Sequence, residues 1–537
     1  MRILQSILKI AILTIVGAAI FVAGAFWSQT RVHGDLRGSS FLENRTRFET
    51  IFIALDAERI GVPVEREGSG GALTSVGDSV VVMTHEGRFF LVDNSSTTEL
   101  SVESPDNGFD AMLAFEKSNP DYQFAHFYFR YNDFAYDDGR LIVSMTKWHA
   151  NDNCYSTVLA TTPAPLTNNP MNWKVTRDDW EETFSTSPCL PPKRGGRAID
   201  GHMAGGRIAI SGDGSVFLAS GDYAVDGTYA AEALAQNSES QYGKVLRINT
   251  ITGNAEVVSQ GHSNMQGISF DLSNQLYVIE HGRRGGDELN LIQNGQDYGW
   301  PQVSLGTRYN KLPLRNTLEY GRHPVFEAPI FAWLPSVAVS SLTVIEDFHP
   351  SWNGDLLAGS LSGKSLFRIR IRDGRVLFSE KIDIGNRIRH LIQHNDEIVL
   401  WTDSKEVIRL RVGAVDASFE FAQAKLNTLG LSSSNRAAAQ TALEACAECH
   451  SFGASPGGNA PALGGIFGTD VASESGYEYS DGLTSLEGKW TSETLAAFLD
   501  NPDSYAPGTL MPDPGIDNSE ILAALTQVLK SLALQAE

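Results

Sequence analysis

Alternation of hydrophobic and polar residues dominates the chain between about residues 33 and 412. The stretch GRIAISGDGSVFLASGD places isoleucines at alternate positions, turns at Asp213-Gly214, and resumes the alternation with Val216 and Leu218. Runs of period two on both sides of D-G, S-N or N-D turns predict β-hairpins. Comparable units are QGISFDLSNQLYVIEHG, LFRIRIRDGRVLFSEKI and RIRHLIQHNDEIVLWTD. Hairpins repeated over about 380 residues predict an all-β propeller, because a single sandwich is rarely so long.

The pattern becomes helical after residue 412, where alanine-rich segments replace the hairpins. The segment SEILAALTQVLKSLAL has apolar residues at helical spacing. A chain of 537 residues is also too long for one ordinary core. We therefore expect a hydrophobic segment at 1–30, a propeller at 31–412, a linker at 413–435 and a small all-α domain at 436–537.

The first thirty residues have the features of an export segment. Arg2 and Lys9 precede eighteen uncharged residues, 10–27, a length between that of a signal-peptide core and that of a short transmembrane helix. The small residues at 23–25 would suit signal cleavage, whereas Trp27 and the positive residues on the retained side favour an uncleaved anchor. Both alternatives export the rest of the chain. We expect a periplasmic protein anchored in the inner membrane by this N-terminal helix.

The helical domain contains the C-x-x-C-H signature of covalently attached c-type haem, formed by Cys446, Cys449 and His450. Two thiols one helical turn apart reach the two vinyl groups, and the histidine supplies an axial nitrogen. Met511 lies in the loop PGTLMPDPG and could supply a thioether as the sixth ligand. The alternative, a structural zinc knuckle, lacks a second Cys/His pair to complete four ligands.

The two other cysteines, Cys154 and Cys189, lie in the propeller region. Two leftover cysteines in an exported chain predict a disulfide, because the compartment is oxidising. Two separate buried thiols remain the alternative.

Residues 444–532 resemble class I cytochrome c domains. The segments CAECHSF, GGNAPALGGIFGTD, YEYSDGL, WTSETLAAFLDNP and PGTLMP occur in the order of that family. The resemblance implies thioether bonds at Cys446 and Cys449 and axial ligation by His450 and Met511. It also implies packing around the porphyrin by Pro461, Tyr479 and Trp490. Membership of an ordinary core is the alternative for these three, and for Trp490 the two readings are equally supported.

Net charge excludes one class of partner and indicates another. The formal charge of −22 makes a nucleic-acid partner unfavourable because phosphate would be repelled. Residues 431–537 carry 14 acidic residues against three basic ones. This acidic surface predicts an external electron acceptor with a basic docking face.

A haem needs an electron donor, and no propeller side chain is a two-electron redox group, so a bound cofactor is expected. No G-x-G-x-x-G motif opens a strand–helix unit, which disfavours nicotinamide and flavin sites of the Rossmann type. His202 comes just before one strand of a hairpin and Asp222 just after the other. The pair could act as general base and orienting carboxylate. A structural histidine held by a turn aspartate is the alternative.

Three segments of the propeller region carry a further resemblance: GHSNMQGISFDLSNQLYVIEHGRRGGDELNLIQNGQDYGWP, PSVAVSSLTVIEDFHPSWNGDLLAGSLSGKSLFRIRI and NRIRHLIQHNDEIVLWTDSKEVIRLRV. Through them, residues 201–412 resemble the glucose/sorbosone dehydrogenase family, six-bladed propellers that use pyrroloquinoline quinone and calcium to oxidise aldoses. The resemblance implies that His202 takes a proton from the anomeric hydroxyl and that Asp222 orients His202. For the quinone pocket it implies Asn264, Gln266, His281, Arg387 and Arg389. For calcium it implies Gly282, Arg283, Glu288 and Tyr298.

Three positions depart from the family pattern. Ser263 and Ser362 replace an arginine and a lysine, and Arg283 replaces a proline. Lys364, two residues from Ser362, is expected on the same side of a strand and could restore one cation. Arg283 could supply another.

The sequence therefore predicts a quinohaemoprotein that oxidises an aldose or related alcohol and passes electrons to its own haem. A propeller without quinone that binds a glycan or a partner protein is the main alternative. A calcium-dependent hydrolase, such as a lactonase, is a third possibility.

Overall fold

The computed structural model of the chain describes residues 47–65, 70–93, 95–122, 124, 126–162, 165–194, 197–198, 201–227, 232–309, 311–314, 319–413, 417–447, 449–453, 460–474, 477, 479–516 and 518–533. The predicted hydrophobic segment at 1–30 lies outside these residues. Within the described ranges, no helix is long and apolar enough to cross a membrane. The chain divides into two compact units, one containing Ala57–Arg411 and the other Val412–Glu537 with Arg47–Asp56.

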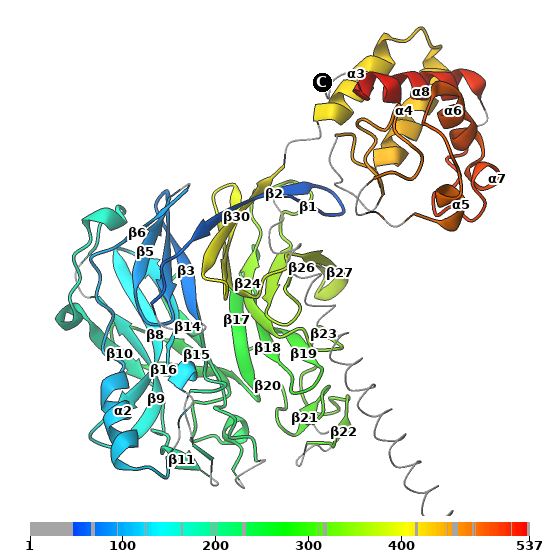
Figure 1. Cartoon of the computed structure of the whole chain (residues 1–537). Helices are drawn as coiled ribbons and strands as arrows, with labels where there is room; N and C mark the ends of the chain where they lie inside the picture. The colour runs from blue at the N-terminus through cyan, green and yellow to red at the C-terminus, as the bar shows by residue number, and fades with distance from the viewer. Residues whose placement is uncertain are drawn as a thin grey trace, which may run out of the picture. The chain divides into compact units, whose positions relative to one another are not determined.

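The first unit is a propeller of six antiparallel sheets (Figure 1). From the innermost strand outward, the first three sheets are β3 (Gly71–Val76), β4 (Ser79–Thr84), β5 (Phe89–Val92), β6 (Thr97–Glu99); β7 (Tyr131–Asp137), β8 (Arg140–His149), β9 (Cys154–Thr161), β10 (Glu181–Ser185); and β13 (Gly205–Ile210), β14 (Val216–Ser220), β15 (Lys244–Ile248), β16 (Ala255–Gln260) with the short parallel β20 (Gln296–Asp297). The other three are β17 (Asn264–Phe270), β18 (Leu276–His281), β19 (Asp287–Leu291), β23 (Phe331–Trp333); β24 (Val339–Val344), β25 (Leu356–Ser360), β26 (Ser365–Arg372), β27 (Arg375–Asp383); and β28 (Ile388–His394), β29 (Glu397–Thr402), β30 (Glu406–Val412), β2 (Ala54–Gly61), β1 (Arg47–Glu49).

The innermost strands form a closed ring. Each contacts the next in the order β3, β7, β13, β17, β24, β28, and β28 contacts β3 again. The sixth sheet takes β2 and β1 from the N-terminal part of the chain, so both ends of the propeller sequence contribute to one blade. The inner edges of the sheets are therefore short and enclosed by the ring.

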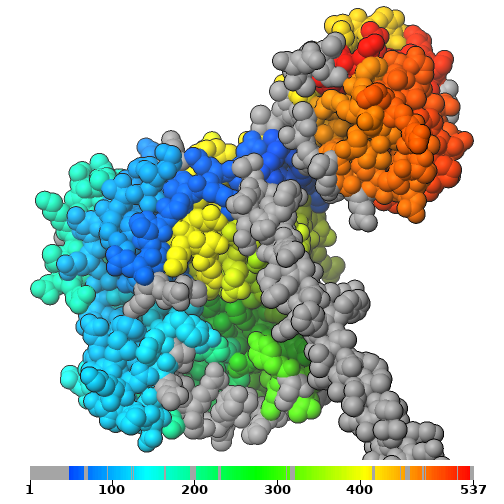
Figure 2. All heavy atoms as spheres, viewed as in Figure 1, coloured from blue at the N-terminus to red at the C-terminus, as the bar shows by residue number. Residues whose placement is uncertain are grey.

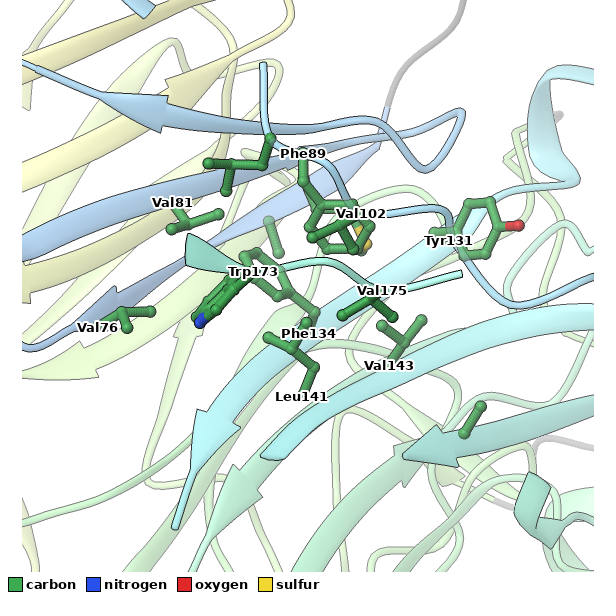
Figure 3. Packing of buried hydrophobic residues seen from close by; sticks show 14 of the residues in the cluster. Val76, Val81, Phe89, Val102, Tyr131, Phe134, Leu141, Val143, Trp173 and Val175 are labelled. Atoms are coloured by element: carbon green, nitrogen blue, oxygen red, sulfur yellow. The ribbon is translucent and has the colours of Figure 1, made fainter. Parts of the chain in front are cut away.

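The four hairpins predicted from alternation are all present. They are the pairs β13–β14, β17–β18, β26–β27 and β28–β29. Apolar residues between the blades form the cores; in the cluster of Figure 3, Phe89 meets Phe134 edge to face at 5.5 Å, and Trp173 is buried beside them. The predicted disulfide between Cys154 and Cys189 is also formed, with Cα atoms 5.6 Å apart.

Arg207, in β13, lies at the centre of the ring with 4% of its surface exposed. Its guanidinium donates to backbone carbonyls of the five other innermost strands, at Gly71 (3.4 Å), Asn132 (3.0 Å), Gln266 (3.2 Å), Ser340 (3.3 Å) and Arg389 (2.7 Å). Each of these residues is among the first three of its strand. The beginnings of the innermost strands therefore meet at one level, and residues that precede them gather at one mouth of the propeller.

Shorter elements lie in the loops between the strands, some between two blades and some within one blade. They are α2 (Phe109–Ser118), the 3-10 turns η1 (His126–Tyr128), η2 (Pro170–Asn172), η3 (Arg177–Asp179) and η4 (Leu234–Gln236), and the two-stranded pairs β11 (Lys193–Arg194) with β12 (Arg197–Ala198) and β21 (Val303–Ser304) with β22 (Glu319–Tyr320).

The C-terminal unit is helical, as predicted. Its helices are α3 (Ala417–Thr428), α4 (Ser433–Ala447), α5 (Asp481–Thr484), α6 (Ser492–Asp500), α7 (Pro502–Tyr505) and α8 (Ser519–Ala533). The prediction of a linker at 413–435 is wrong for α3, because Ala422 and Leu426 of this helix are fully buried in the core that α4 and α8 share. Figure 2 shows the segments of this unit, coloured yellow to red, packed into one rounded body.

Candidate active site and haem site

Two loops of the third blade bring the predicted catalytic region together. Residues 201–206 lead into β13, and residues 221–226 follow its partner β14. Tyr223 N–H donates to Met203 O (3.1 Å), and Gly221 N–H donates to Ala204 O (2.9 Å). Met203, Tyr223 and Ala224 all have left-handed backbones, with φ of 61°, 52° and 58°. Non-glycine residues in this conformation are strained, and such strain concentrates at functional sites.

His202 lies half-buried in the first of these loops, with its ring 4.5 Å from that of Tyr128. Tyr128 ends η1, three residues before the innermost strand β7. Gly201 permits this approach, since a Cβ at that position would come within 2.7 Å of Tyr128 O. The histidine is thus held at the mouth by an aromatic ring from the neighbouring blade.

The predicted orienting contact from Asp222 to His202 is not what the structure shows. Asp222 is fully buried, and its two carboxylate oxygens accept hydrogen bonds from Trp300 Nε1 (2.7 Å) and from the Ala224 N–H (2.8 Å). The imidazole of His202 is not among the described contacts of this carboxylate. Trp300, from a loop remote in sequence, occupies this carboxylate because its indole N–H needs a buried acceptor. Asp222 therefore holds Trp300 against the loop that follows β14, and these residues form part of the wall of the propeller mouth.

Burial raises the pKa of Asp222 to about 6, with Asp226 adding to the rise and Arg283 opposing it. As pH increases past the ordinary value of 3.8, the unfolded chain loses this proton first, so Asp222 makes the folded state less stable between about pH 4 and pH 6. We expect Asp222→Asn to gain stability relative to the unmodified chain over this interval, by up to about 3 kcal/mol. Urea unfolding of both proteins at pH 4 and pH 7 measures the change, and a constant difference between them would contradict it.

Arg283 does not serve as a free replacement cation. Its guanidinium forms an ion pair with Asp226, donates to Met203 Sδ (2.9 Å) and lies 5.4 Å from the centre of the Trp300 ring. The side chain is thus neutralised and stacked, which ties the loop after β18 to the loop that holds His202. Its predicted role as a compensating charge is wrong.

One hydrogen-bonded chain joins Asn264, Gln266 and His281, three residues that the family resemblance assigns to the quinone pocket. Gln266 Nε2 donates to Asn264 Oδ1 (2.8 Å), and Asn264 Nδ2 lies 3.2 Å from His281 Nδ1. His281 Nε2 lies 2.6 Å from Val339 O, an acceptor, so Nε2 carries the hydrogen and Nδ1 accepts. Burial lowers the pKa of His281, which keeps the ring neutral.

Arg387 and Arg389 share one carboxylate. Arg389, 5% exposed, binds Asp403 through Nε (3.0 Å) and Nη2 (2.8 Å), and Arg387 binds it through Nε (2.9 Å). Among the described residues, Arg389 Nη1 and both Nη groups of Arg387 make no hydrogen bond. Two cations on one anion leave a net positive site with donors available to a carboxylate ligand.

The two departures from the family cations differ in their surroundings. Ser263 is 2% exposed, and its Oγ is buried without a hydrogen-bond partner among the described residues. Ser362 is exposed. Lys364 has a left-handed backbone (φ 49°) in the turn before β26 and is not a strand residue, so its predicted place on the same side of a strand as residue 362 is wrong.

The predicted calcium residues take part in contacts with other groups of the protein. Tyr298 OH donates to Leu291 O and accepts from Gln293 N–H (3.0 Å), and the Arg283 side chain is held by Asp226. Gly282 N–H donates to Asp287 Oδ1 (3.0 Å). Burial raises the pKa of Glu288 to about 8, with Glu280 adding to the rise. No group of three or more histidine, cysteine or acidic residues in the described ranges could hold a metal ion.

His450, the predicted axial ligand, lies in the C-terminal unit just after α4. Cys446 lies near the end of α4, and the His450 N–H donates to its carbonyl (2.9 Å) in the turn that follows. His450 Nδ1 lies 2.7 Å from Pro461 O, so Nδ1 carries the hydrogen and Nε2 keeps its lone pair for iron. Burial lowers the pKa of His450, which favours the neutral form that metals require. Neither Cys446 nor Cys449 is part of a disulfide.

Met511 packs against two apolar clusters of this unit. One is the core of α3, α4 and α8, against which Cys446 also packs, and the other contains Trp490. Trp490 is 6% exposed and lies against Phe498 and Tyr505. Of the three residues assigned to the porphyrin surroundings, Pro461 acts through its carbonyl on His450, and Tyr479 OH accepts from the Glu474 N–H (3.3 Å).

Sequence reasoning missed several residues of the propeller mouth: Tyr128, Arg130, Asp226, Trp300 and Asp403. For Asp403 a signal was present, because the β28–β29 hairpin pairs Ile388 with Thr402 and so places Asp403 opposite Arg387. Tyr128 and Arg130 come from the connection between two blades, and Asp226 and Trp300 come from long loops within blades. No periodicity in these segments indicates which residues meet.

Comparison with known proteins agrees with this division into two parts. Residues 174–411 match the family model described as Glucose / Sorbosone dehydrogenase. Aldose sugar dehydrogenase YliI of Escherichia coli is 32% identical over 209 residues, which cover 35% of this chain and 54% of that protein. An uncharacterized protein of Synechocystis is 32% identical over 257 residues, 44% of this chain and 60% of that protein. The chain thus spans little more than half the length of these relatives.

Cytochrome c of Cannabis sativa is 38% identical over 86 residues, covering 16% of this chain and 78% of that protein. The crystal structure of the soluble aldose sugar dehydrogenase of E. coli in its apo form superposes with a TM-score of 0.52 at 22% identity, covering 67% of this chain and all of that one, which supports the propeller fold. The chain belongs to the cytochrome c family through its C-terminal region. The region in front of it, residues 174–411, matches the Glucose / Sorbosone dehydrogenase model.

Proposed function

We propose that the chain is a dehydrogenase that oxidises an aldose or a related alcohol in its propeller and passes the electrons to a c-type haem in its C-terminal domain. The observation that carries the proposal is the gathering of His202, Asn264, His281 and Arg389 around the mouth of a sugar-dehydrogenase-type propeller in a chain that also contains a cytochrome c domain. Fusion favours such transfer, because tethering raises the effective concentration of the acceptor.

Pyrroloquinoline quinone is the proposed oxidant, and the residues at the mouth fit a polycarboxylate of this kind. Arg387 and Arg389 offer unused guanidinium N–H groups, and Ser263 Oγ is a buried hydroxyl without a partner among the described residues. Asn264 and Gln266 offer amide groups from the same innermost strand. When bound, the quinone would supply a hydride acceptor.

His202 would act as the general base that takes the proton of the anomeric hydroxyl. The Tyr128 ring limits the orientation of the imidazole. The wall formed by Asp222, Trp300, Arg283 and Asp226 would exclude water from one side of the sugar and hold the loop of His202 in place.

His450 and Met511 would bind the haem iron, with thioether bonds at Cys446 and Cys449; haem would accept the electrons one at a time.

We further propose that the chain is exported to the periplasm and anchored by its N-terminal segment. The Cys154–Cys189 disulfide supports the export, because disulfides form in oxidising compartments. An external acceptor with a basic face would suit the acidic C-terminal domain. Calcium remains part of the proposal only as a family property.

The test measures reduction of the haem in the complete chain. Quinone and a panel of aldoses and alcohols are added, and the absorption spectrum of the haem reports whether it becomes reduced. We expect reduction that requires both the quinone and a sugar. Quinone binding without reduction by any sugar would contradict the proposed dehydrogenase. Absence of quinone binding would favour a glycan- or partner-binding propeller, and turnover of a lactone without haem reduction would favour a hydrolase.

A further inference from the structure

Arg130 lies at the mouth of the propeller, although no motif marks it. It immediately precedes the innermost strand β7, and its carbonyl accepts from the Thr146 N–H (3.2 Å). Two residues earlier, Tyr128 lies against His202. Because Arg207 brings the beginnings of all the innermost strands to one level, Arg130 is on the same side of the ring as Asn264 and Arg389.

Gly70 gives the Arg130 side chain its path. A Cβ on Gly70 would lie 2.7 Å from Arg130 Cδ and 3.4 Å from its Nε, and the φ of 147° at Gly70 also disfavours a side chain. The Gly70 carbonyl accepts from Trp401 Nε1 (2.8 Å), which fixes this backbone between the sixth blade and the first. The arginine therefore extends over a fixed backbone surface that only glycine leaves open.

Among the described residues, positive charge exceeds negative charge around Arg130. Those that act on its charge include Arg389, Arg207, Asp403 and Tyr128. Asp403 is shared by Arg387 and Arg389, and the nearest carboxylate to Arg207, Asp133, is 3.7 Å away. Burial, with Arg389 and Arg207 adding to it, lowers the pKa of Arg130 to about 9. In a chain with a net charge of −22, this is a local reversal of sign.

We propose that Arg130 is an anion-binding residue of the mouth and that it contacts a carboxylate of the quinone together with Arg387 and Arg389. The inference rests on the proposed function and deepens it. It also accounts for the two positions where family cations are missing: Ser263 and Ser362 carry no charge, Arg283 is neutralised by Asp226, and Arg130 supplies a cation from the second blade.

Quinone binding to the full chain, titrated by calorimetry without any sugar, tests the assignment. We expect Arg130→Gln to weaken binding by about 10- to 100-fold, the range for loss of one charge-assisted hydrogen bond. Arg140→Gln is the matched control, because Arg140 follows the turn at the other end of the same hairpin, about 20 Å along the strand. It should bind as the unmodified chain does.

Thermal unfolding without quinone separates a ligand-binding role from a structural one. A residue that acts mainly on the ligand should leave the midpoint of Arg130→Gln close to that of the unmodified chain, while affinity falls. Equal affinity of the unmodified chain and Arg130→Gln would overturn the assignment and leave the dehydrogenase proposal intact. A lowered midpoint with proportionally lowered affinity would make Arg130 structural and would also overturn it. Failure of the unmodified chain to bind the quinone would overturn both proposals.

Discussion

Replacement of His202 by glutamine should lower the rate of sugar-dependent haem reduction by about 100- to 10,000-fold, the contribution of a positioned general base. Glutamine is close in size to histidine and keeps hydrogen-bonding capacity, but it cannot take a proton at neutral pH. The contact with Tyr128 would lose an aromatic partner without leaving a large cavity. Stopped-flow absorption of the haem at saturating sugar, with the quinone already loaded, measures the effect.

The control for His202 is His126→Gln. His126 belongs to η1, the 3-10 turn that ends in Tyr128, but its Nε2 lies 2.6 Å from Glu116 Oε2. This variant should keep nearly the full rate. Quinone affinity should be the same in both variants and in the unmodified chain. A rate for His202→Gln within about threefold of normal, or a loss that follows weaker quinone binding, would mean that another group takes the proton.

The sequence predicted those features of the structure that depend on residues close together in the chain. The hairpins followed from period-two alternation around Asp213-Gly214 and its equivalents, because strand pairing across a tight turn needs no distant residue. The haem signature was equally local, since Cys446, Cys449 and His450 lie within one turn of chain. The position of α3 was missed because its apolar face, with Ala422 and Leu426, resembles a short alanine-rich linker until α8 packs against it.

The mouth of the propeller could not be predicted in the same way. Asp222 was expected to reach His202 because the two flank one hairpin, but the loop carrying Trp300 occupies the carboxylate. Arg283 was expected to be free, and Asp226 neutralises it. In both cases the partner lies on another loop, and sequence spacing contains no information about it. Family resemblance identified residues that the structure gathers, but it could not reveal which of their atoms are already engaged.

Substitution of Arg207 by methionine should reduce the free energy of unfolding of the propeller by about 3–5 kcal/mol, the cost of breaking a buried charged network. Methionine approximates the length of the side chain but leaves carbonyl groups of five blades without their shared donor. It also leaves Asp133, 3% exposed, with His390 as its remaining ionisable neighbour at 3.4 Å. Guanidinium unfolding of the full chain at pH 7, followed by the β-sheet circular dichroism signal, measures the loss.

Arg247→Met is the matched control, because Arg247 is in the same blade and forms an ion pair with Asp213 at the surface, where solvent screens the interaction. Its stability should change little. Adding Asp133→Asn to Arg207→Met should recover part of the lost stability, since the uncompensated carboxylate disappears while the unpaired carbonyls remain. Equal losses for Arg207→Met and Arg247→Met would contradict the role of Arg207 at the centre of the ring.

The role of Arg207 also links the stability of the propeller to quinone binding. Two of the carbonyls that Arg207 holds belong to Gln266 and Arg389, residues of the proposed quinone pocket. Any spreading of the strands in Arg207→Met should therefore weaken quinone binding in parallel with stability.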